Sequence, residues 1–242
     1  MSDSTNFKLA VLIDADNAQP AICQELLAEI SKFGVASVKR AYGDWTTTNL
    51  KGWKSHLHKH AIQPVQQFSY TQGKNSTDSS LIIDAMDLLH EGRLDGFCLV
   101  SSDSDFTRLA NRIRESGLVV YGFGEKKTPE PFVAACDKFV YTEVLRASKD
   151  TSAKDESSNR ELKEIIIDAI DAVSKDDGWA PLSGVGSYII KNTPSFDPRN
   201  YGYDKLGRLV RGLTYLEVQE RRFGDESSSM HIYIRQKESQ QG

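Results

Sequence analysis

Short apolar runs alternate with amphipathic segments along the first part of the chain. Continuous apolar positions predict buried strands, and apolar positions at helical spacing predict helices between them. The expected strands are 8–13, 36–41, 62–67, 97–100 and 119–121, and the expected helices are 20–32, 50–60, 78–91 and 106–116. This alternation predicts an α/β domain at residues 1–146, with a mostly parallel, Rossmann-like sheet covered by helices on both faces.

A polar stretch, ASKDTSAKDESSN at residues 147–159, follows this domain. It is rich in Ser, Asp and Lys and has no apolar periodicity, which is typical of a solvated linker. Apolar spacing then predicts helices around 162–173, 185–190 and 206–213, and a β-hairpin formed by 217–222, a turn at 224–229, and 230–235. Helices followed by a two-stranded wing predict a small winged-helix-like α+β domain at residues 160–242.

Charge and cysteine content limit the classes of function. The net charge of −4 argues against a protein that coats nucleic acid through bulk positive charge, so any such binding must be local. The three cysteines are far apart and form no CxxC pair, which indicates free thiols in a reducing compartment. The chain shows neither a signal peptide nor an apolar run long enough for a membrane span, so we expect a cytoplasmic protein. A homodimer is compatible with the sequence.

Acidic residues gather where the expected strands end. Asp14 and Asp16 follow the first strand, Asp103 and Asp105 follow the fourth, and Asp78 lies in a loop that starts a helix. In a parallel sheet these three loops share one edge, so the carboxylates should converge. Like charges at short range repel, and a hard divalent cation is the usual way to stabilise them. We therefore expect Mg²⁺ or Mn²⁺ at this edge.

Such a cation can lower the pKa of a water molecule and neutralise charge on a phosphodiester, which is nuclease chemistry. An Asp after a strand can instead cap the next helix, and Asp103 or Asp105 could do so for the helix near Phe106. The joint pattern across three loops favours the cation. Asp84 follows Asp78 by about 240° around an ideal helix, so we interpret it as a structural partner or a surface acid.

Four segments, VLIDADNA, GKNSTDSSLIIDAMDLL, FCLVSSDSDFTRLANRIRESG and VVYGFGEKKTP, resemble the NYN domain, a LabA-like branch of the PIN-like ribonucleases. The resemblance covers about residues 8–145. It implies that cleavage of RNA depends on Mg²⁺ or Mn²⁺, although some members bind RNA without cutting it. The resemblance implies that the catalytic, metal-binding acids are Asp14, Asp78, Asp103 and Asp105. The hydrogen-bonding groups around them would be Asn17, Ser101 and Ser102, and Asp16 is a plausible accessory ligand.

In the second domain, WAPLSGVGSYIIKNTPSFDPRNYGYDKLGRLVRGL resembles the OST-HTH domain, also called LOTUS, over about residues 159–237. Such domains are associated with RNA binding, and some relatives bind protein partners. Lys205, Arg208 and Arg211 recur at helical spacing and could form a strip along an RNA backbone. A solvated helix face explains each of these three residues equally well.

Two weaker patterns complete the candidate residues. Lys74, in the loop before Asp78, and Lys126 and Lys127, in GFGEKKTP, could contact RNA phosphates. His56 and His60 of HLHKH share a helix face and could bind zinc or phosphate. Because no HExxH motif or nearby cysteine accompanies them, we interpret them as solvated histidines at a helix end.

These observations predict a metal-dependent ribonuclease with a C-terminal RNA-binding domain. The alternative from another class is a non-catalytic RNA-binding adaptor that keeps the same fold. A third hypothesis is a haloacid-dehalogenase-type phosphatase, because Asp14-Ala15-Asp16 resembles the DxD nucleophile motif of that family. That family has Thr or Val two residues after the second Asp, whereas this chain has Ala18, so we rank it last.

Overall fold

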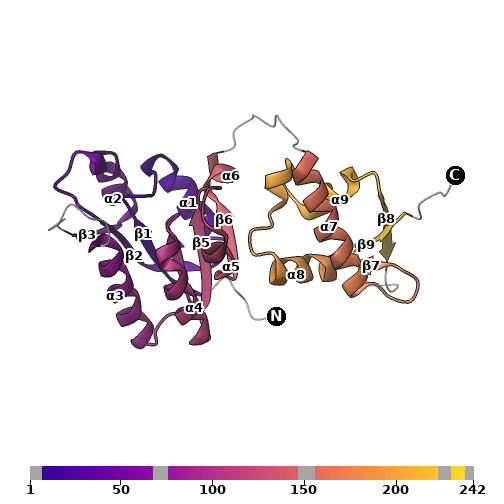
Figure 1. Cartoon of the computed structure of the whole chain (residues 1–242), viewed down its shortest axis with the longest axis horizontal. Coiled ribbons are helices and arrows are strands. Elements are labelled where there is room, and N and C mark those ends of the chain that lie inside the picture. The colour runs from indigo at the N-terminus through magenta and orange to yellow at the C-terminus, as the bar shows by residue number, and fades with distance from the viewer. Residues whose placement is uncertain (1–6, 68–75, 147–155, 223–229, 238–242) are drawn as a thin grey trace. The chain divides into compact units, whose positions relative to one another are not determined.

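The computed structural model describes residues 7–67, 76–146, 156–222 and 230–237. Contacts divide the chain into two compact units, Met1–Ser148 and Lys149–Gly242 (Figure 1). Cys23, Cys98 and Cys136 are all buried free thiols, as the sequence indicates. Within the described residues, no helix has both the length and the apolar character needed to cross a bilayer.

The first unit is built on a six-stranded, all-parallel sheet of order β3-β2-β1-β4-β5-β6. Its strands are β1 (Lys8–Asp14), β2 (Val35–Gly43), β3 (Gln63–Gln66), β4 (Gly96–Val100), β5 (Val119–Gly124) and β6 (Lys138–Tyr141). Its α-helices are α1 (Cys23–Ile30), α2 (Lys54–His60), α3 (Ser76–His90), α4 (Thr107–Glu115), α5 (Glu130–Ala134) and α6 (Thr142–Arg146). The short 3-10 helices of this unit are η2 (Pro20–Ile22), η3 (Asn49–Trp53) and η4 (Ser104–Phe106). The predicted parallel α/β fold is confirmed.

Helices cover both faces of this sheet because its central strands are apolar on both sides. On β1, Ala10 and Leu12 face one core cluster, which contains side chains of α3, α4 and α5. Leu9, Val11 and Ile13 face the other, which contains side chains of α1 and α2 and is packed by α6. All five of these β1 side chains are fully buried. Burial on both faces explains why β1 is a continuous apolar run rather than an alternating one.

The strand order changes direction beside β1. The chain runs outward from β1 to β2 and β3, then crosses back through α3 to β4 on the other side of β1. The carboxyl ends of β1 and β4 therefore lie where the strand order reverses, which is the position at which ligands bind in open α/β sheets. The fold places the acid-bearing loops at this position.

The sheet has one strand more than the sequence predicts. The additional strand is β6, and the two short helices beside it, α5 and α6, were also not predicted. The four-residue strand lies at the edge of the sheet, where it pairs only with β5. Apolar residues precede and follow it without an interrupting turn signal, so periodicity alone does not separate it from its neighbours.

The second unit combines helices with a three-stranded antiparallel sheet of order β7-β9-β8. Its elements are α7 (Glu156–Val173), β7 (Ala180–Pro181), α8 (Leu182–Asn192), η5 (Pro198–Tyr201), α9 (Leu206–Gly212), β8 (Leu216–Arg222) and β9 (Met230–Gln236). The hairpin of β8 and β9 is confirmed, and its predicted turn at 224–229 lies outside the described residues. Helix α7 begins inside the stretch interpreted as linker, and the two-residue strand β7 was too short to predict.

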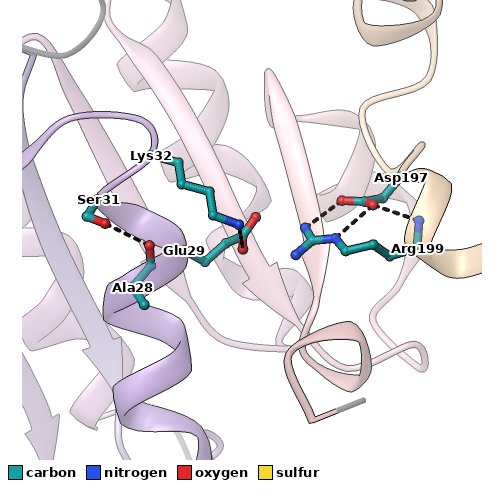
Figure 2. A network of polar contacts seen from close by, with 6 residues as sticks. All are labelled: Ala28, Glu29, Ser31, Lys32, Asp197 and Arg199. Carbon is teal, nitrogen blue, oxygen red and sulfur yellow. Dashed lines mark hydrogen bonds and ion pairs between the residues drawn. The ribbon is translucent and has the colours of Figure 1, made fainter. Parts of the chain in front are cut away.

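Local polar contacts fix element ends in each unit, and Figure 2 shows one set from each. At the end of α1, Lys32 Nζ lies 2.7 Å from Glu29 Oε2, and the Ser31 hydroxyl donates to a carbonyl of the preceding turn. In the second unit, Asp197 caps η5 by accepting from the backbone N–H of Arg199 at 2.9 Å. The guanidinium of Arg199 also donates to Asp197 at 2.6 Å, which balances the buried charge.

Candidate functional site

The carboxylate of Asp14, at the end of β1, is fully buried. Its Oδ2 accepts hydrogen bonds from Ser101 Oγ at 2.8 Å and from Asn17 Nδ2 at 2.7 Å. Burial raises the pKa of Asp14, and the hydrogen bonds from Asn17 and Ser101 partly oppose that rise. Two of the four predicted neighbours, Asn17 and Ser101, therefore hold the Asp14 side chain in one orientation.

Three further acids come together at the same edge. Asp78 lies in the first turn of α3, and Asp103 and Asp105 lie at the start of η4, directly after β4. One carboxylate oxygen from each of the three lies within 4.8 Å of the others. The pKa of Asp78 is raised to about 6, first by burial and then by the negative charges of Asp14, Asp103 and Asp105. We call Asp78, Asp103 and Asp105 the acid cluster.

Asp103 both caps the short helix η4 and belongs to the acid cluster. Its Oδ1 accepts from the backbone N–H of Asp105 at 3.0 Å, so it caps η4, and its own N–H donates to Ser101 Oγ. A carboxylate can accept about four hydrogen bonds, so a cap does not use up its binding capacity. The cap fixes Asp103 within the acid cluster.

The remaining predicted neighbours connect loops to one another. Asp16 Oδ2 accepts from Thr77 Oγ1 at 3.0 Å, which joins the loop after β1 to the start of α3. Ser102 Oγ accepts from the backbone N–H of Glu125 at 2.9 Å, which joins the loops after β4 and β5. Thr77 and Glu125 were not predicted, because nothing in their local sequence indicates contacts between separate loops.

The close approach of these loops requires a glycine at the end of β5. A Cβ atom on Gly124 would lie 2.6 Å from the carbonyl oxygen of Ser101 and 2.6 Å from Thr128 Oγ1. Both distances are shorter than a carbon atom tolerates, so a larger residue would push the loops apart. Gly124 therefore permits close packing of the two loops beside the site.

Asp84 lies outside the acid cluster and has a structural role. Its Oδ2 accepts from Arg40 Nη1 at 2.8 Å and from Tyr42 Oη at 2.9 Å. Burial first, and then the hydrogen bond to Asp84, raises the pKa of Tyr42. These contacts tie α3 to β2, which agrees with the interpretation of Asp84 as a structural partner.

Two of the lysines predicted to contact RNA, Lys126 and Lys127, are exposed in the loop after β5. Lys127 Nζ lies 2.8 Å from Glu125 Oε2. Lys74 lies outside the described residues. Exposed ion pairs are weak, so a phosphate could replace Glu125 as the partner of Lys127 at little cost.

The predicted basic strip of the second unit lies on and beside α9. Lys205 is exposed at the N-cap, Arg208 lies 3.2 Å from Asp204, and Arg211 lies 2.5 Å from Glu220. The arginine side chains are 71% and 45% exposed. The strip is therefore accessible, and two of its three members already take part in surface ion pairs.

The donor chemistry of the acid cluster fits a hard divalent cation. Three carboxylates converge, and carboxylate oxygens are the donors that Mg²⁺ and Mn²⁺ prefer. Burial, and after it the charges of the neighbouring carboxylates, raises the pKa of Asp78, and a bound cation would offset both effects. The acid cluster is a suitable site for either ion.

An all-parallel α/β sheet with acids at its switch point, followed by a small helical domain with an antiparallel sheet, defines the PIN-like class with an added α+β module. The chain belongs to the NYN domain family, whose model matches residues 8–145. Residues 156–227 match the OST-HTH/LOTUS domain. Both resemblances inferred from the sequence are confirmed.

Solved structures include similar chains. A protein of unknown function from Vibrio parahaemolyticus is 18% identical, with a TM-score of 0.49, over 58% of this chain and 96% of that one. Residues 175–257 of a protein from Chromobacterium violaceum, solved by NMR, are 51% identical, with a TM-score of 0.26, over 31% of this chain and 78% of that one. A comparison with curated proteins found no match.

Proposed function

We propose that this protein is a metal-dependent ribonuclease whose second domain binds RNA. The observation that carries the proposal is the acid cluster, in which carboxylate oxygens from the start of α3 and the start of η4 lie within 4.8 Å of one another. Its position at the switch point of the sheet and the membership of the chain in the NYN family support the same function.

Asp78, Asp103 and Asp105 would hold Mg²⁺ or Mn²⁺, with Asp14 adding negative charge beside them. When bound, the cation supplies Lewis-acid chemistry, because it lowers the pKa of water and neutralises charge on a phosphodiester. Ser101 and Asn17 orient Asp14 through their hydrogen bonds, and Asp16 and Ser102 hold the surrounding loops through Thr77 and Glu125. The three acids of the cluster would thus bind the ion, and the other residues would position Asp14 and the surrounding loops.

RNA would be held by charge outside this centre. Lys126 and Lys127 are exposed on the loop after β5, which bonds to the loop that follows β4. In the second domain, Lys205, Arg208 and Arg211 would contact the RNA backbone. The OST-HTH/LOTUS match supports nucleic-acid binding by this domain. Because the net charge of the chain is −4, local groups of basic residues would have to supply the attraction to RNA phosphates.

Labelled RNA and DNA incubated with the protein in Mg²⁺, Mn²⁺ or chelator would test this function. We expect cleavage of RNA with Mg²⁺ or Mn²⁺, no cleavage with chelator, and loss of cleavage in Asp103→Asn. Because Asn is also a good N-cap, this variant should keep the cap on η4 and remain folded. Asp87→Asn, at an exposed position on α3, is the matched control and should cleave normally.

Normal cleavage by Asp103→Asn would overturn the proposed centre. Tight RNA binding without cleavage under any divalent metal would instead establish the adaptor function. The phosphatase hypothesis requires an accessible nucleophile, whereas Asp14 is fully buried and hydrogen-bonded through both oxygens. The burial of Asp14 disfavours that hypothesis.

A further inference from the structure

A cysteine and two histidines meet on the face of the sheet that α1 and α2 cover. Cys23 is the first residue of α1, and His56 and His60 lie one turn apart on α2. The sulfur of Cys23 and one ring nitrogen from each histidine lie within 4.8 Å of one another. This group shares no residue with the acid cluster. Both histidines are half-buried, and one nitrogen of each ring is inaccessible, so the interpretation of these histidines as solvated holds only in part.

Two of the imidazole nitrogens are buried without a partner. Nδ1 of His56 and Nε2 of His60 are inaccessible to solvent and have no hydrogen-bond partner among the described residues. A buried polar atom left unpaired costs about 1–3 kcal/mol, and native structures contain few of them. Two such atoms beside a buried thiol indicate that a ligand binds there.

Surrounding contacts hold the two rings in place. The rings of His56 and His60 are stacked, with centroids 6.1 Å apart and planes 9° apart, and Trp53 packs edge-on against His56. At the end of α2, Lys39 Nζ donates to the carbonyl oxygen of His60 at 2.5 Å. Both rings are therefore fixed before any ligand arrives, which lowers the entropic cost of binding.

The nearby lysines are engaged elsewhere. Lys39 is bound to the His60 carbonyl, and Lys59 Nζ donates to Gln24 Oε1 at 3.0 Å. Burial, followed by the charge of Lys59, lowers the pKa of His60, which favours the neutral imidazole that binds metals. Burial also raises the pKa of the Cys23 thiol to about 11, so metal binding would release its proton to solvent.

Sulfur and imidazole donors select a different kind of metal from the acid cluster. Thiolate and imidazole suit zinc and other borderline or soft ions, whereas Mg²⁺ and Mn²⁺ prefer carboxylate oxygen. We propose that Cys23, His56 and His60 form a Zn²⁺ site that joins α1 to α2. Three protein ligands leave the fourth tetrahedral position for water.

A Zn²⁺ ion at this site would restrain α1 and α2 relative to each other. Both helices pack on the same core cluster, and α1 follows the loop that carries Asp14 and Asn17. A metal bond between the two helices would limit their relative motion and hold the start of α1 in place. The protein would then carry a zinc ion that joins two helices close in sequence to its proposed catalytic loop.

Titration of the full-length, metal-free protein with Co²⁺ tests the site, with Mg²⁺ in excess to occupy the acid cluster. We expect one equivalent of Co²⁺ to give a thiolate-to-metal charge-transfer band, which Zn²⁺ abolishes by displacing Co²⁺. Cys23→Ser should lack the band. His56→Gln and His60→Gln should weaken Zn²⁺ affinity by more than about tenfold, since even residues that only support metal ligands cost that much.

His58→Gln is the matched control, because His58 is exposed on the same helix and lies outside the group. It should bind Zn²⁺ as the unmodified protein does. Circular dichroism of each variant shows whether it is folded, so that loss of a metal ligand can be told from unfolding. Zn²⁺ should raise the Tm of the unmodified protein but not that of folded His60→Gln. Absence of the band in the unmodified protein, or its persistence in Cys23→Ser, would overturn the proposal.

Discussion

The hydroxyl of Ser101 donates a hydrogen bond of 2.8 Å to the buried carboxylate of Asp14, and so connects the ends of β1 and β4. The two strands pair in parallel with Ile13 opposite Val100, which places Asp14 and Ser101 at the next positions. Both side chains are almost completely buried. The contact therefore links the stability of the sheet edge to the orientation of a proposed active-site acid.

Ser101→Ala should destabilise the protein by about 1–3 kcal/mol, because it leaves a buried carboxylate with one hydrogen bond fewer. Urea unfolding followed by circular dichroism measures the change in the free energy of unfolding. Ser116→Ala, at an exposed position at the end of α4, is the control and should change stability by less than about 0.5 kcal/mol. Equal effects of the two substitutions would contradict the role of Ser101.

The raised pKa of Asp78 predicts opposite pH dependences with and without a metal. The folded protein binds the Asp78 proton more tightly than the unfolded chain, whose ordinary pKa is 3.8. The stabilising contribution of this proton is complete below that value and is lost as the pH rises through about 6. Metal-free protein should therefore lose stability over this window, and added Mg²⁺ should restore stability above it.

Thermal unfolding at about pH 5 and about pH 7.5, with and without Mg²⁺, measures this linkage. Mg²⁺ should bind more weakly at the lower pH, because the proton on Asp78 competes with it. In Asp78→Asn both the pH dependence across this window and the response to Mg²⁺ should shrink. A variant that keeps both responses would place the metal elsewhere.

Asp84→Ala should lower stability without lowering the cleavage rate of the folded protein. The substitution removes the acceptor of Arg40 and Tyr42, and leaving partly buried donors unpaired costs about 1–3 kcal/mol. Asp87→Ala, exposed on the same helix, serves as the comparison for stability. Lost cleavage with unchanged stability would move Asp84 into the catalytic centre.

Arg208→Ala should weaken RNA binding and flatten its salt dependence. Loss of one phosphate contact should reduce the slope of log K against log salt by about 0.7 for single-stranded RNA. Fluorescence anisotropy with labelled RNA across a salt series measures the slope, and Arg112→Ala on α4 is the control. A slope unchanged by Arg208→Ala would show that α9 does not face the RNA.

The sequence determined the outline of the fold and the position of the acids. Strands such as β1 are buried on both faces, so their apolar runs are unmistakable, and the polarity change at Asp14 and after Val100 marks their carboxyl ends. Parallel pairing then brings those ends to one edge, which is why the convergence could be predicted. The edge strand β6 and the two-residue β7 could not, because short elements carry too little periodicity.

The Cys23 group shows what only the tertiary structure decided. HLHKH has no cysteine near it in sequence, so the local pattern alone indicated solvated histidines. Because α1 and α2 pack on the same face of the sheet, Cys23 approaches His56 and His60, and their buried nitrogens lose contact with water. Strand order sets which helices become neighbours, and that order depends on long-range packing that no local pattern of residues records.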